Sequence, residues 1–438
     1  MIRPPTTDLR PPQRAAKRRV ALVHDWLTGM RGGEKVLEAI VELYPDATLH
    51  TLLHAPGTVT ATIEKLSTRC SFVQWLPASS HYYRHYLPVF PTAIEQFDLD
   101  AYDLVISTSH CAAKSVVAAG RARHVCYCHS PMRYAWDQFN AYFGPDIVGP
   151  TRSKWFRPVL ARMARWDRDT AGRVDRYVAN SHYVAGRIRR YYNRGSTVVH
   201  PPVDTDFYRP EPSLEPENRY LVVSALVPYK RVDVAIRACA RIRAPLTVVG
   251  RGPETDRLKA VAKGLGADVA FAGWIDDDEV RDLYRRSRAV VMPGVEDFGM
   301  VPVEAQACGR PVVVFAQGGA LESVVDGITG IHVPDDTADA FADALNAVST
   351  RSWDSAAIRT HAETFGKARF QQEFQAIVDE NPAARVNPAA REDDRDSRSA
   401  QEDPREIGNH RPDHPAGGSN AASYRQPRVN PAAREDDQ

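Results

Sequence analysis

Short apolar runs rich in β-branched residues recur along most of this chain, and a stretch of helical character follows nearly every one of them. The runs read, in order, VALVHDW, YDLVISTS, HVCYCHS, RYVANS, STVVHP, YLVVSAL, PLTVVG, VAFAG, AVVMPG and PVVVF. Alternation of this kind is typical of βα units on parallel sheets. The number of runs suits two such sheets, so we predict an α/β protein.

Residues 200–219 interrupt this alternation. The segment reads HPPVDTDFYRPEPSLEPENR, and its prolines and acidic residues are typical of a connection between domains. With 438 residues, of which 43% are hydrophobic, the chain is long enough for two core-forming domains. We therefore expect domains at residues 19–202 and 203–364, a flexible segment at 1–18, and a helix at 365–380 that can return to the first domain.

The last part of the chain, residues 381–438, is rich in Pro, Ala, Arg, Asp and Ser. Such a composition cannot bury a core, so we expect this tail to be disordered. The sequence RVNPAAREDD occurs twice within it, from Arg385 and from Arg428. Two copies do not make a solenoid. The duplication is either a tether or interaction motif, or neutral drift in a low-complexity segment.

Charge, hydropathy and cysteine content argue against several classes of function. A formal net charge of +1 gives no whole-molecule argument for nucleic-acid binding. No apolar run approaches the roughly 20 residues that span a bilayer, and the basic, Pro-rich start does not resemble a signal peptide. The six cysteines are scattered, and Cys126 and Cys128 lack a second pair at zinc-ligand spacing. We expect a reduced, cytoplasmic protein.

The stretch VMPGVEDFGMVPVEAQACGRPVVVF, residues 291–315, places Glu296 and Glu304 on either side of a turn. The pattern predicts a strand before this turn and a helix after it, with Pro302 in the first helical turn. At the carboxyl end of a parallel strand, the backbone N–H groups of residues 299–303 suit an anion, and a neighbouring carboxylate suits neutral hydroxyls. Phosphate and polyol together indicate a nucleotide sugar.

Other glycines can also begin helices and expose N–H groups to phosphate. They lie in GMRGGEK at residues 29–35, GRGPE at 250–254 and QGGALES at 317–323. Each is weak alone, because such turns are usually structural. No Gly-x-Gly-x-x-Gly fits a strand-to-helix turn and no Gly-Lys-Ser/Thr occurs, which argues against dehydrogenases and P-loop enzymes.

The signature Glu296-Asp297-Phe298-Gly299-Met300, closed by Glu304 in a Glu-x7-Glu pattern, resembles the donor site of retaining glycosyltransferases of family 4. The resemblance runs from about Val20 to Val378. It includes, in the family's order, GMRGGEKVLEAI, YCHSPMRYAWDQF, RVDRYVANSHYVAGRI, HPPVDTDFY and VSALVPYKRVDVAI. It implies the GT-B architecture, in which an N-terminal Rossmann-like acceptor domain faces a C-terminal Rossmann-like donor domain across a cleft.

The resemblance also implies roles for the signature residues. Glu296 would hold hydroxyls of the donor hexose and Glu304 those of the ribose. The N–H groups that would receive sugar and phosphate oxygens belong to Phe298, Gly299, Met300 and Val301. A buried hydroxyl without a partner costs about 1 to 3 kcal/mol, so such acceptors meet a physical need.

Lys230, in VPYKR, matches the lysine that family members place on the donor diphosphate. A leaving nucleoside diphosphate gains negative charge, so a fixed cation there stabilises the transition state more than the ground state. The family usually has an arginine a few residues upstream, where this chain has Ala225. Arg231, or a basic side chain from the N-terminal domain, can take over that position.

His129, in CHSPMRY, resembles the family histidine that contacts the donor hexose. Gly32 and Gly33 would let the backbone of the first βα loop approach the diphosphate or the acceptor, as in the family. No general base is assigned, because same-face attack assisted by the leaving phosphate is the usual proposal for this fold. We expect no cofactor and no essential metal: Asp98 and Asp100 form an Asp-x-Asp, but they precede a strand where carboxylates commonly end turns.

Two segments of the predicted acceptor domain interleave basic and aromatic residues, SHYYRHYLPVF at 80–90 and RSKWFRPVLARMARWDR at 152–168. On a helix, the second would combine an apolar face with basic flanks, as in segments that rest on anionic lipid. That face could lead a lipid-linked acceptor to the cleft from the inner face of the plasma membrane. The alternative is a helix whose aromatic face packs in the core.

The predicted function is retaining transfer of a hexose from a nucleotide diphosphate sugar to a lipid or glycan acceptor in cell-envelope glycoconjugate synthesis. Similarity to bacterial mannosyltransferases makes GDP-mannose the first expected donor, and UDP-glucose or another UDP-sugar stays open. The Glu-x7-Glu pattern disfavours a nucleotide-sugar epimerase on the same fold. A catalytically inactive nucleotide-sugar-binding scaffold is the non-enzymatic alternative, and Ala225 supports it.

Overall fold

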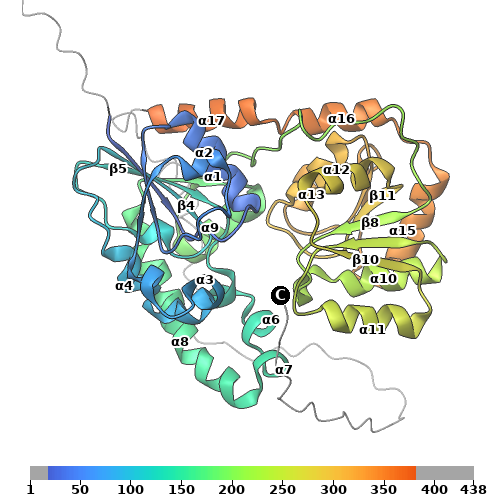
Figure 1. Ribbon diagram of the computed structural model, residues 1–438, viewed down its shortest axis with the longest axis horizontal. Helices are drawn as coiled ribbons and strands as arrows, with labels where there is room; N and C mark the ends of the chain where they lie inside the picture. The colour runs from blue at the N-terminus through green and yellow to red at the C-terminus, as the bar shows by residue number, and fades with distance from the viewer. Residues whose placement is uncertain (1–17, 381–438) are drawn as a thin grey trace, which may run out of the picture. The chain divides into compact units, whose positions relative to one another are not determined.

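The computed structural model describes residues 18–380 and builds them around two parallel β-sheets (Figure 1). The N-terminal sheet has the strand order β3 (Ser67–Cys70), β2 (Thr48–Thr51), β1 (Val20–His24), β4 (Leu104–Ser109), β5 (Arg123–Cys128), β6 (Arg176–Ala179), β7 (Ser196–Val198). The C-terminal sheet has the order β10 (Val269–Gly273), β9 (Leu246–Val249), β8 (Tyr220–Val223), β11 (Ala289–Met292), β12 (Val312–Phe315), β13 (Gly330–Val333). The predicted disordered tail and nearly all of the predicted flexible start lie outside the described residues.

Helices connect the strands of both sheets. In the N-terminal half they are α1 (Gly32–Leu43), α2 (Ala61–Glu64), α3 (Ser79–Tyr82), α4 (Phe90–Glu95), α5 (Arg133–Trp136), α6 (Phe139–Phe143), α7 (Pro145–Val148), α8 (Pro150–Asp169) and α9 (His182–Tyr192). In the C-terminal half they are α10 (Val232–Arg241), α11 (Thr255–Leu265), α12 (Asp277–Arg286), α13 (Met300–Ala307), α14 (Ala320–Ser323), α15 (Ala338–Thr350) and α16 (Ser355–Glu363). The last helix, α17 (Lys367–Asp379), packs on the N-terminal half. The 3₁₀ turns are η1 (Phe72–Trp75), η2 (Tyr83–Val89), η3 (Ala113–Ser115), η4 (Thr170–Arg173) and η5 (Pro228–Lys230).

Alternate residues of a strand point to opposite faces of the sheet, and both faces of the N-terminal sheet are buried. Leu22 of β1 packs in a cluster with Val36 of α1, whereas Val23 packs in a second cluster with Phe90 of α4. Strand β4 is buried at every residue. These contacts explain why the strands read as nearly continuous apolar runs, and each of the ten predicted runs contains a strand.

The C-terminal sheet is covered in the same way. Val222 of β8 packs with Ala235 of α10, and its neighbour Leu221 packs with Val303 of α13. The carboxyl ends of β8 and β11 therefore lead directly into η5 and α13, the elements that carry the predicted donor residues.

The chain crosses between the two halves twice. It leaves the N-terminal half after β7 and returns just before α17, whose Phe370 and Phe374 pack with Leu22 in the N-terminal core (Figure 1, α17 beside α1). The two crossings touch, since the N–H of Val203 donates to the carbonyl of Phe365 at 3.0 Å and Val203 forms a parallel bridge with Gly366.

Candidate active site

The signature turn lies between β11 and α13, at the carboxyl edge of the C-terminal sheet. Gly299 precedes the helix with φ of 86°, in the left-handed region that favours glycine. The N–H groups of Met300 and Val301 lie in the first turn of α13 and have no partner within the helix. Glu304 follows one turn later and is buried. Carboxylate and helix N-terminus therefore come together as the pattern predicts.

Glu296 lies in the turn and forms an ion pair with Lys230, the last residue of η5. Both side chains are mostly buried, with 13% and 17% of their surfaces exposed. A mostly buried charge is costly without a partner of opposite sign, so Lys230 and Glu296 hold each other in place. The pair joins two predicted site residues that lie 66 positions apart in the sequence.

The QGGALES segment, residues 317–323, makes backbone contacts with this turn. The N–H of Gly319 donates to the carbonyl of Glu296 at 2.8 Å, and Glu296 forms a parallel bridge with Gly318. A Cβ atom on Gly319 would overlap the carbonyl oxygen of Asp297. Of the two interpretations of these glycines, the close backbone contacts favour the structural one.

Glu304 is held by residues from both halves of the chain. Its Oε2 accepts a hydrogen bond from the hydroxyl of Tyr284, on α12, at 2.9 Å. Its Oε1 accepts one from Nζ of Lys35, on α1, at 3.2 Å, and Lys35 also donates to the hydroxyl of Tyr208 at 3.3 Å. Neither Lys35 nor Tyr284 was predicted as a partner of Glu304. Lys35 lies 269 positions before Glu304 in the sequence.

Asp297, the second residue of the signature, also receives N-terminal side chains. Nε of Arg133 donates to its Oδ2 at 2.8 Å, and Nη1 of Arg187 lies 3.6 Å from its Oδ1. The hydroxyl of Ser181 donates to its backbone carbonyl at 2.6 Å. Burial alone would lower the pKa of Arg133, but Asp297 outweighs that effect and the pKa is raised. Asp297 is thus an anchor between the halves.

The first βα loop lies beside the same turn. A Cβ atom on Gly32 would be 3.0 Å from Sδ of Met300, and one on Gly33 would be 3.6 Å from Nε2 of His129. The absence of a side chain at Gly32 therefore lets the start of α1 approach α13 closely, whereas the space beside Gly33 would accept a Cβ atom. The structure brings Gly32, Gly33, His129 and Met300 together.

His129 has an unused hydrogen-bonding atom in this region. Its Nε2 is buried and has no hydrogen-bond partner among the described residues. Burial, together with the neighbouring His110 and His24, lowers the pKa of His129 to about 3. The imidazole is therefore neutral at physiological pH. A neutral ring can exchange a hydrogen bond with a hydroxyl, and it carries no charge for a phosphate.

Asp25 orders the neighbouring strand end. Its buried carboxylate accepts hydrogen bonds from the backbone N–H groups of four consecutive residues, His110, Cys111, Ala112 and Ala113, at 2.6 to 2.9 Å. This satisfies the carboxylate and fixes the loop after β4 that carries His110. The residue follows β1 in the sequence run VALVHDW, where no role was predicted for it.

Other predicted positions lie outside this cluster of contacts. Arg231 forms an ion pair with Asp336 instead of joining the Lys230–Glu296 pair. Ala225 is exposed. Asp98 accepts a hydrogen bond from the N–H of Asp100 at 3.1 Å, as in a carboxylate-capped turn. Within residues 18–380, no group of three or more His, Cys, Asp or Glu side chains is arranged to hold a metal ion.

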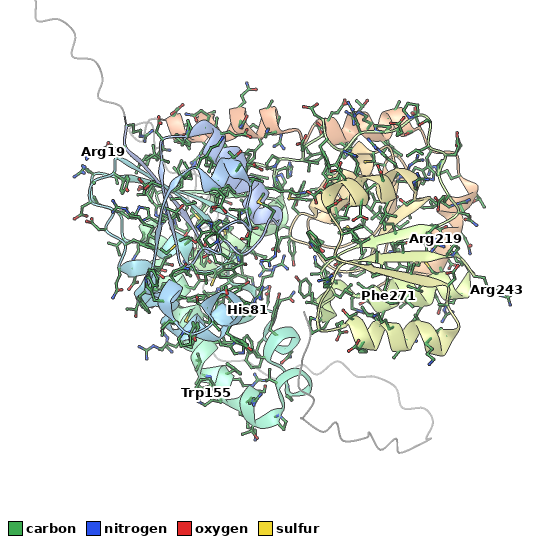
Figure 2. All side chains as sticks on the ribbon, in the orientation of Figure 1. Arg19, His81, Trp155, Arg219, Arg243 and Phe271 are labelled. Atoms are coloured by element: carbon green, nitrogen blue, oxygen red, sulfur yellow. The ribbon has the colours of Figure 1, made fainter. Side chains whose placement is uncertain are left out.

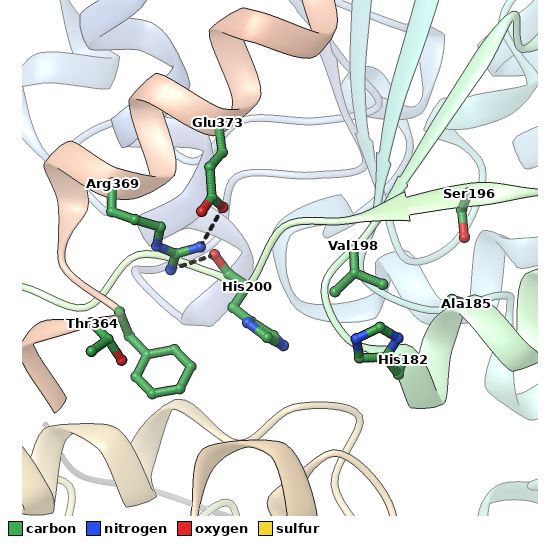
Figure 3. Close-up of a pocket in the computed structure, with 9 residues that line it drawn as sticks. His182, Ala185, Ser196, Val198, His200, Thr364, Arg369 and Glu373 are labelled. Carbon is green, nitrogen blue, oxygen red and sulfur yellow. Dashed lines mark hydrogen bonds and ion pairs between the residues drawn. The ribbon is translucent and has the colours of Figure 1, made fainter. Parts of the chain in front are cut away.

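A cavity of about 600 Å³ lies between α9, β7 and α17 (Figure 3). Its lining includes His182, His200, Phe365 and Arg369. The ring of His200 stacks on Phe298 at 5.2 Å, so the cavity wall touches the back of the turn. A second cavity of about 300 Å³ is lined by Gly250, Arg251, Gly252, Thr255, Lys259, Phe271 and Gly273. It lies beside the loop after β8, since the N–H of Leu226 donates to the carbonyl of Arg251.

Two family profiles match the chain in succession. Residues 30–207 match the family described as Glycosyltransferase Family 4, and residues 204–365 match that described as Glycosyl transferases group 1. Together they cover every strand of both sheets except β1, and they meet at the predicted connection between the domains.

Curated relatives share part of this region. The D-inositol 3-phosphate glycosyltransferase of Kribbella flavida is 33% identical over 227 residues, which cover 44% of this chain and 53% of the relative. D-inositol 3-phosphate glycosyltransferase 2 of Catenulispora acidiphila is 37% identical over 209 residues, covering 40% and 48%. The chain spans about half the length of these relatives.

Solved structures agree over a longer stretch. HepE of Anabaena, in complex with UDP, has a TM-score of 0.61 and 18% identity, covering 82% of this chain and 99% of that one. Sucrose-phosphate synthase of Thermosynechococcus elongatus has a TM-score of 0.61 and 17% identity, covering 82% and 98%. This likeness confirms the predicted GT-B fold of two Rossmann-like domains. Because the two profiles together cover residues 30–365 on that fold, the chain belongs to glycosyltransferase family 4.

Proposed function

We propose that this protein is a retaining glycosyltransferase that moves a hexose from a nucleotide diphosphate sugar to an acceptor. The observation that carries the proposal is the turn between β11 and α13. There two carboxylates, the partly exposed Glu296 and the buried Glu304, lie on either side of a helix N-terminus, and each has a lysine partner. Carboxylates suit sugar hydroxyls, and the helix N-terminus with Lys230 suits a diphosphate.

The roles follow from these contacts. Glu296 accepts hydrogen bonds from hydroxyls of the hexose, and Glu304 from those of the ribose. Lys230 lies against Glu296, so it is close to the place where the diphosphate joins the hexose. As that bond breaks, negative charge grows on the diphosphate, and a fixed cation stabilises it without reorganisation.

The reaction balances without a protein nucleophile. The acceptor hydroxyl attacks C1 of the hexose from the side on which the nucleoside diphosphate leaves. The bond between C1 and the phosphate oxygen breaks, a new bond forms between C1 and the acceptor oxygen, and the acceptor proton passes to the leaving phosphate. The unpartnered Nε2 of the neutral His129 supports a contact with a hexose hydroxyl during this step.

GDP-mannose is the first candidate donor, on the strength of the sequence resemblance. UDP-glucose is the second, supported by the HepE structure in complex with UDP-glucose, which is 19% identical to this chain with a TM-score of 0.62. For the acceptor, a lipid-linked or glycan hydroxyl in cell-envelope synthesis is the first candidate. The relatives named for D-inositol 3-phosphate support a phosphorylated cyclitol as the second.

Calorimetry with GDP, UDP, GDP-mannose and UDP-glucose, each with and without added Mg²⁺, tests the proposal. A ligand at about 100 times its Kd should stabilise the fold by roughly 2.7 kcal/mol, which a thermal shift detects. Selective binding of GDP or UDP compounds, followed by donor turnover, supports transfer and names the base. Binding without turnover favours the scaffold. Failure of all four to bind contradicts the proposal.

We further propose that the acceptor domain works against an anionic membrane from the cytoplasmic side. Large apolar side chains are exposed on η1 and α3, where Trp75 is 84% and Tyr82 57% exposed, and on α8, where Trp155 is 61% exposed (Figure 2, near the labelled His81 and Trp155). Exposed basic residues of α8 are Arg152, Lys154, Arg157, Arg162, Arg165 and Arg168. Aromatic residues with basic flanks suit an anionic lipid surface.

The inner face of α8 meets the other expectation for this segment. Leu160 and Met163 pack in one core cluster with Phe90 and Leu87. The helix therefore combines a packed face with an exposed basic face, and the exposed face is the basis for the proposed membrane contact. Among residues 18–380, no helix has the length and apolar character needed to cross a bilayer.

Sedimentation with vesicles tests this second proposal. The protein should bind vesicles of phosphatidylcholine with 30% phosphatidylglycerol, and binding should weaken with salt and in Trp75→Ser. Trp274→Ser is the matched control, because Trp274 is 69% exposed in the C-terminal domain. Equal loss in both variants, or no binding by the wild type, contradicts membrane docking through this surface.

A further inference from the structure

Lys35 reaches from the acceptor domain into the donor domain. It follows Gly32, Gly33 and Glu34 in the first turn of α1. Its Nζ lies 3.2 Å from Oε1 of Glu304, 3.3 Å from the hydroxyl of Tyr208 and 3.5 Å from Oδ2 of Asp277. Each of these partners belongs to the C-terminal half of the chain. The ammonium group thus takes its ion-pair and hydrogen-bond partners from the opposite domain.

The surroundings of Lys35 keep it charged. Only 27% of its side chain is exposed. Burial alone lowers the pKa of Lys35, but the oxygen atoms of Glu304, Tyr208 and Asp277 outweigh this effect and raise it. An ammonium in this position is a permanent cation at physiological pH.

Glu304 depends on this cation. Its carboxylate is almost fully buried, and among the described residues its ion-pair partner is Lys35. The hydroxyl of Tyr284 occupies the other oxygen and brings no charge. Removing one member of a buried ion pair leaves an uncompensated charge, so the carboxylate would lose its fixed orientation without Lys35.

We propose that Lys35 is a positioning residue that orients Glu304 for the ribose hydroxyls of the donor, so that the donor site is complete only when the two domains meet. This inference rests on the proposed function. It assigns to the GGEK segment a role beyond backbone approach: Gly32 lets the start of α1 come near Met300 of α13, and Lys35 engages the carboxylate of Glu304.

The test compares nucleotides with and without ribose hydroxyls. The variants are Lys35→Met, which keeps the aliphatic length, and Lys35→Arg, which keeps the charge. Lys65→Met is the control, because Lys65 is exposed in the same domain. Calorimetry measures Kd for GDP, UDP and their 2′,3′-dideoxy analogues, and a thermal melt establishes that each variant is folded. Lys35→Gln replaces Lys35→Met if the latter does not fold.

The wild type should bind the preferred ribonucleotide about 10-fold or more tightly than its dideoxy analogue. Lys35→Met should bring this ratio close to 1, whereas Lys35→Arg and Lys65→Met should keep it. In turnover assays, Lys35→Met should raise the donor KM with a smaller change in kcat, since it acts through binding geometry. Combined with Glu304→Gln, it should add little further loss, because both changes remove the same recognition.

Two results would overturn the inference alone: an unchanged ratio in Lys35→Met while the wild type discriminates, or tighter ribonucleotide binding in Lys35→Met. The second would mean that Lys35 competes with the ribose for Glu304. If the wild type binds neither GDP nor UDP, the proposed function itself fails and this inference fails with it.

Discussion

The carboxyl edges of the two sheets carry opposite kinds of polar group. On the C-terminal sheet, the turn after β11 and the neighbouring η5 hold charged pairs, among them Lys230 with Glu296. On the N-terminal sheet, the strand ends hold imidazoles whose pKa values burial lowers, among them His110 and His129. In the proposed function, the first edge takes the diphosphate and the hydroxyls held by Glu296 and Glu304, and the second edge adds a neutral hydrogen-bonding group, His129.

In the proposed function, this difference gives the diphosphate and the hexose of the donor different surroundings. A diphosphate needs cations that stay charged, and burying these requires carboxylate partners. A hexose needs hydrogen bonds without a net field, which a neutral histidine supplies at lower desolvation cost. In the proposed site, Lys230 lies in the C-terminal domain and the neutral His129 in the N-terminal domain.

Loss of charge at the C-terminal edge should have the largest effect. Lys230→Ala should lower kcat by about 100- to 1,000-fold, because it removes stabilisation of the leaving diphosphate. The measurement is steady-state turnover of the donor that binds in calorimetry. Lys263→Ala, at an exposed position of α11, is the control. A change in KM alone would move Lys230 from the transition state to ground-state binding.

Glu304→Ala should come next, with a donor KM about 10- to 100-fold higher and a smaller change in kcat. The reason is that a ribose hydroxyl loses a charged acceptor, worth about 1.5 to 3 kcal/mol. Glu363→Ala serves for comparison, since Glu363 is exposed on α16. If kcat fell and KM stayed constant, the ribose assignment would be wrong.

The neutral edge should respond more weakly. His129→Ala should reduce kcat/KM about 10-fold, the typical value of one hydrogen bond to an uncharged group. Because the pKa of His129 is lowered to about 3, the ratio of wild type to variant should be constant between pH 5.5 and pH 8. A ratio that changes near pH 6.5 would show that the ring titrates there, and the contrast between the two edges would then disappear.

Stability should depend on pH through the N-terminal sheet, with no change in activity at pH 7. Burial lowers the pKa values of His50 and His124 to about 4, below the unfolded value of 6.5. As pH falls through 6.5, the unfolded chain binds protons that the folded chain does not, so stability is lost between about pH 6.5 and pH 4. The loss should be about 1 kcal/mol per histidine by pH 6.

Urea unfolding at pH 7.5 and pH 6 measures this loss. His124→Asn should reduce the difference in free energy between the two pH values. His81→Asn should leave it unchanged, because His81 is exposed. Higher stability at pH 6 than at pH 7.5 in the wild type would contradict the buried neutral state of these rings.

The sequence predicted elements whose signal is local. Ten apolar runs gave ten strands, and the signature from Glu296 to Glu304 predicted a strand, a turn and a helix in their correct order. Strands β2 (TLHT), β3 (STRC) and β13 (GIHV) were missed because none of them contains a run of three or more apolar β-branched or aliphatic residues.

Contacts between distant residues could not be predicted in the same way. Lys35 stands in the quoted GGEK motif, and Arg133 in CHSPMRY, yet their partners Glu304 and Asp297 lie 269 and 164 positions away. A single sequence contains no signal that pairs them. Arg231 was one predicted substitute for the arginine expected at Ala225, but its side chain pairs with Asp336.

The hydrogen-bonded pair of crossings at Val203 and Gly366 limits how the domains can move. A single crossing would allow the halves to rotate about several axes. Two crossings held together allow fewer, because a rotation must keep the contact between Val203 and Gly366 intact. A rotation of one half against the other that keeps this contact has its axis near these two residues.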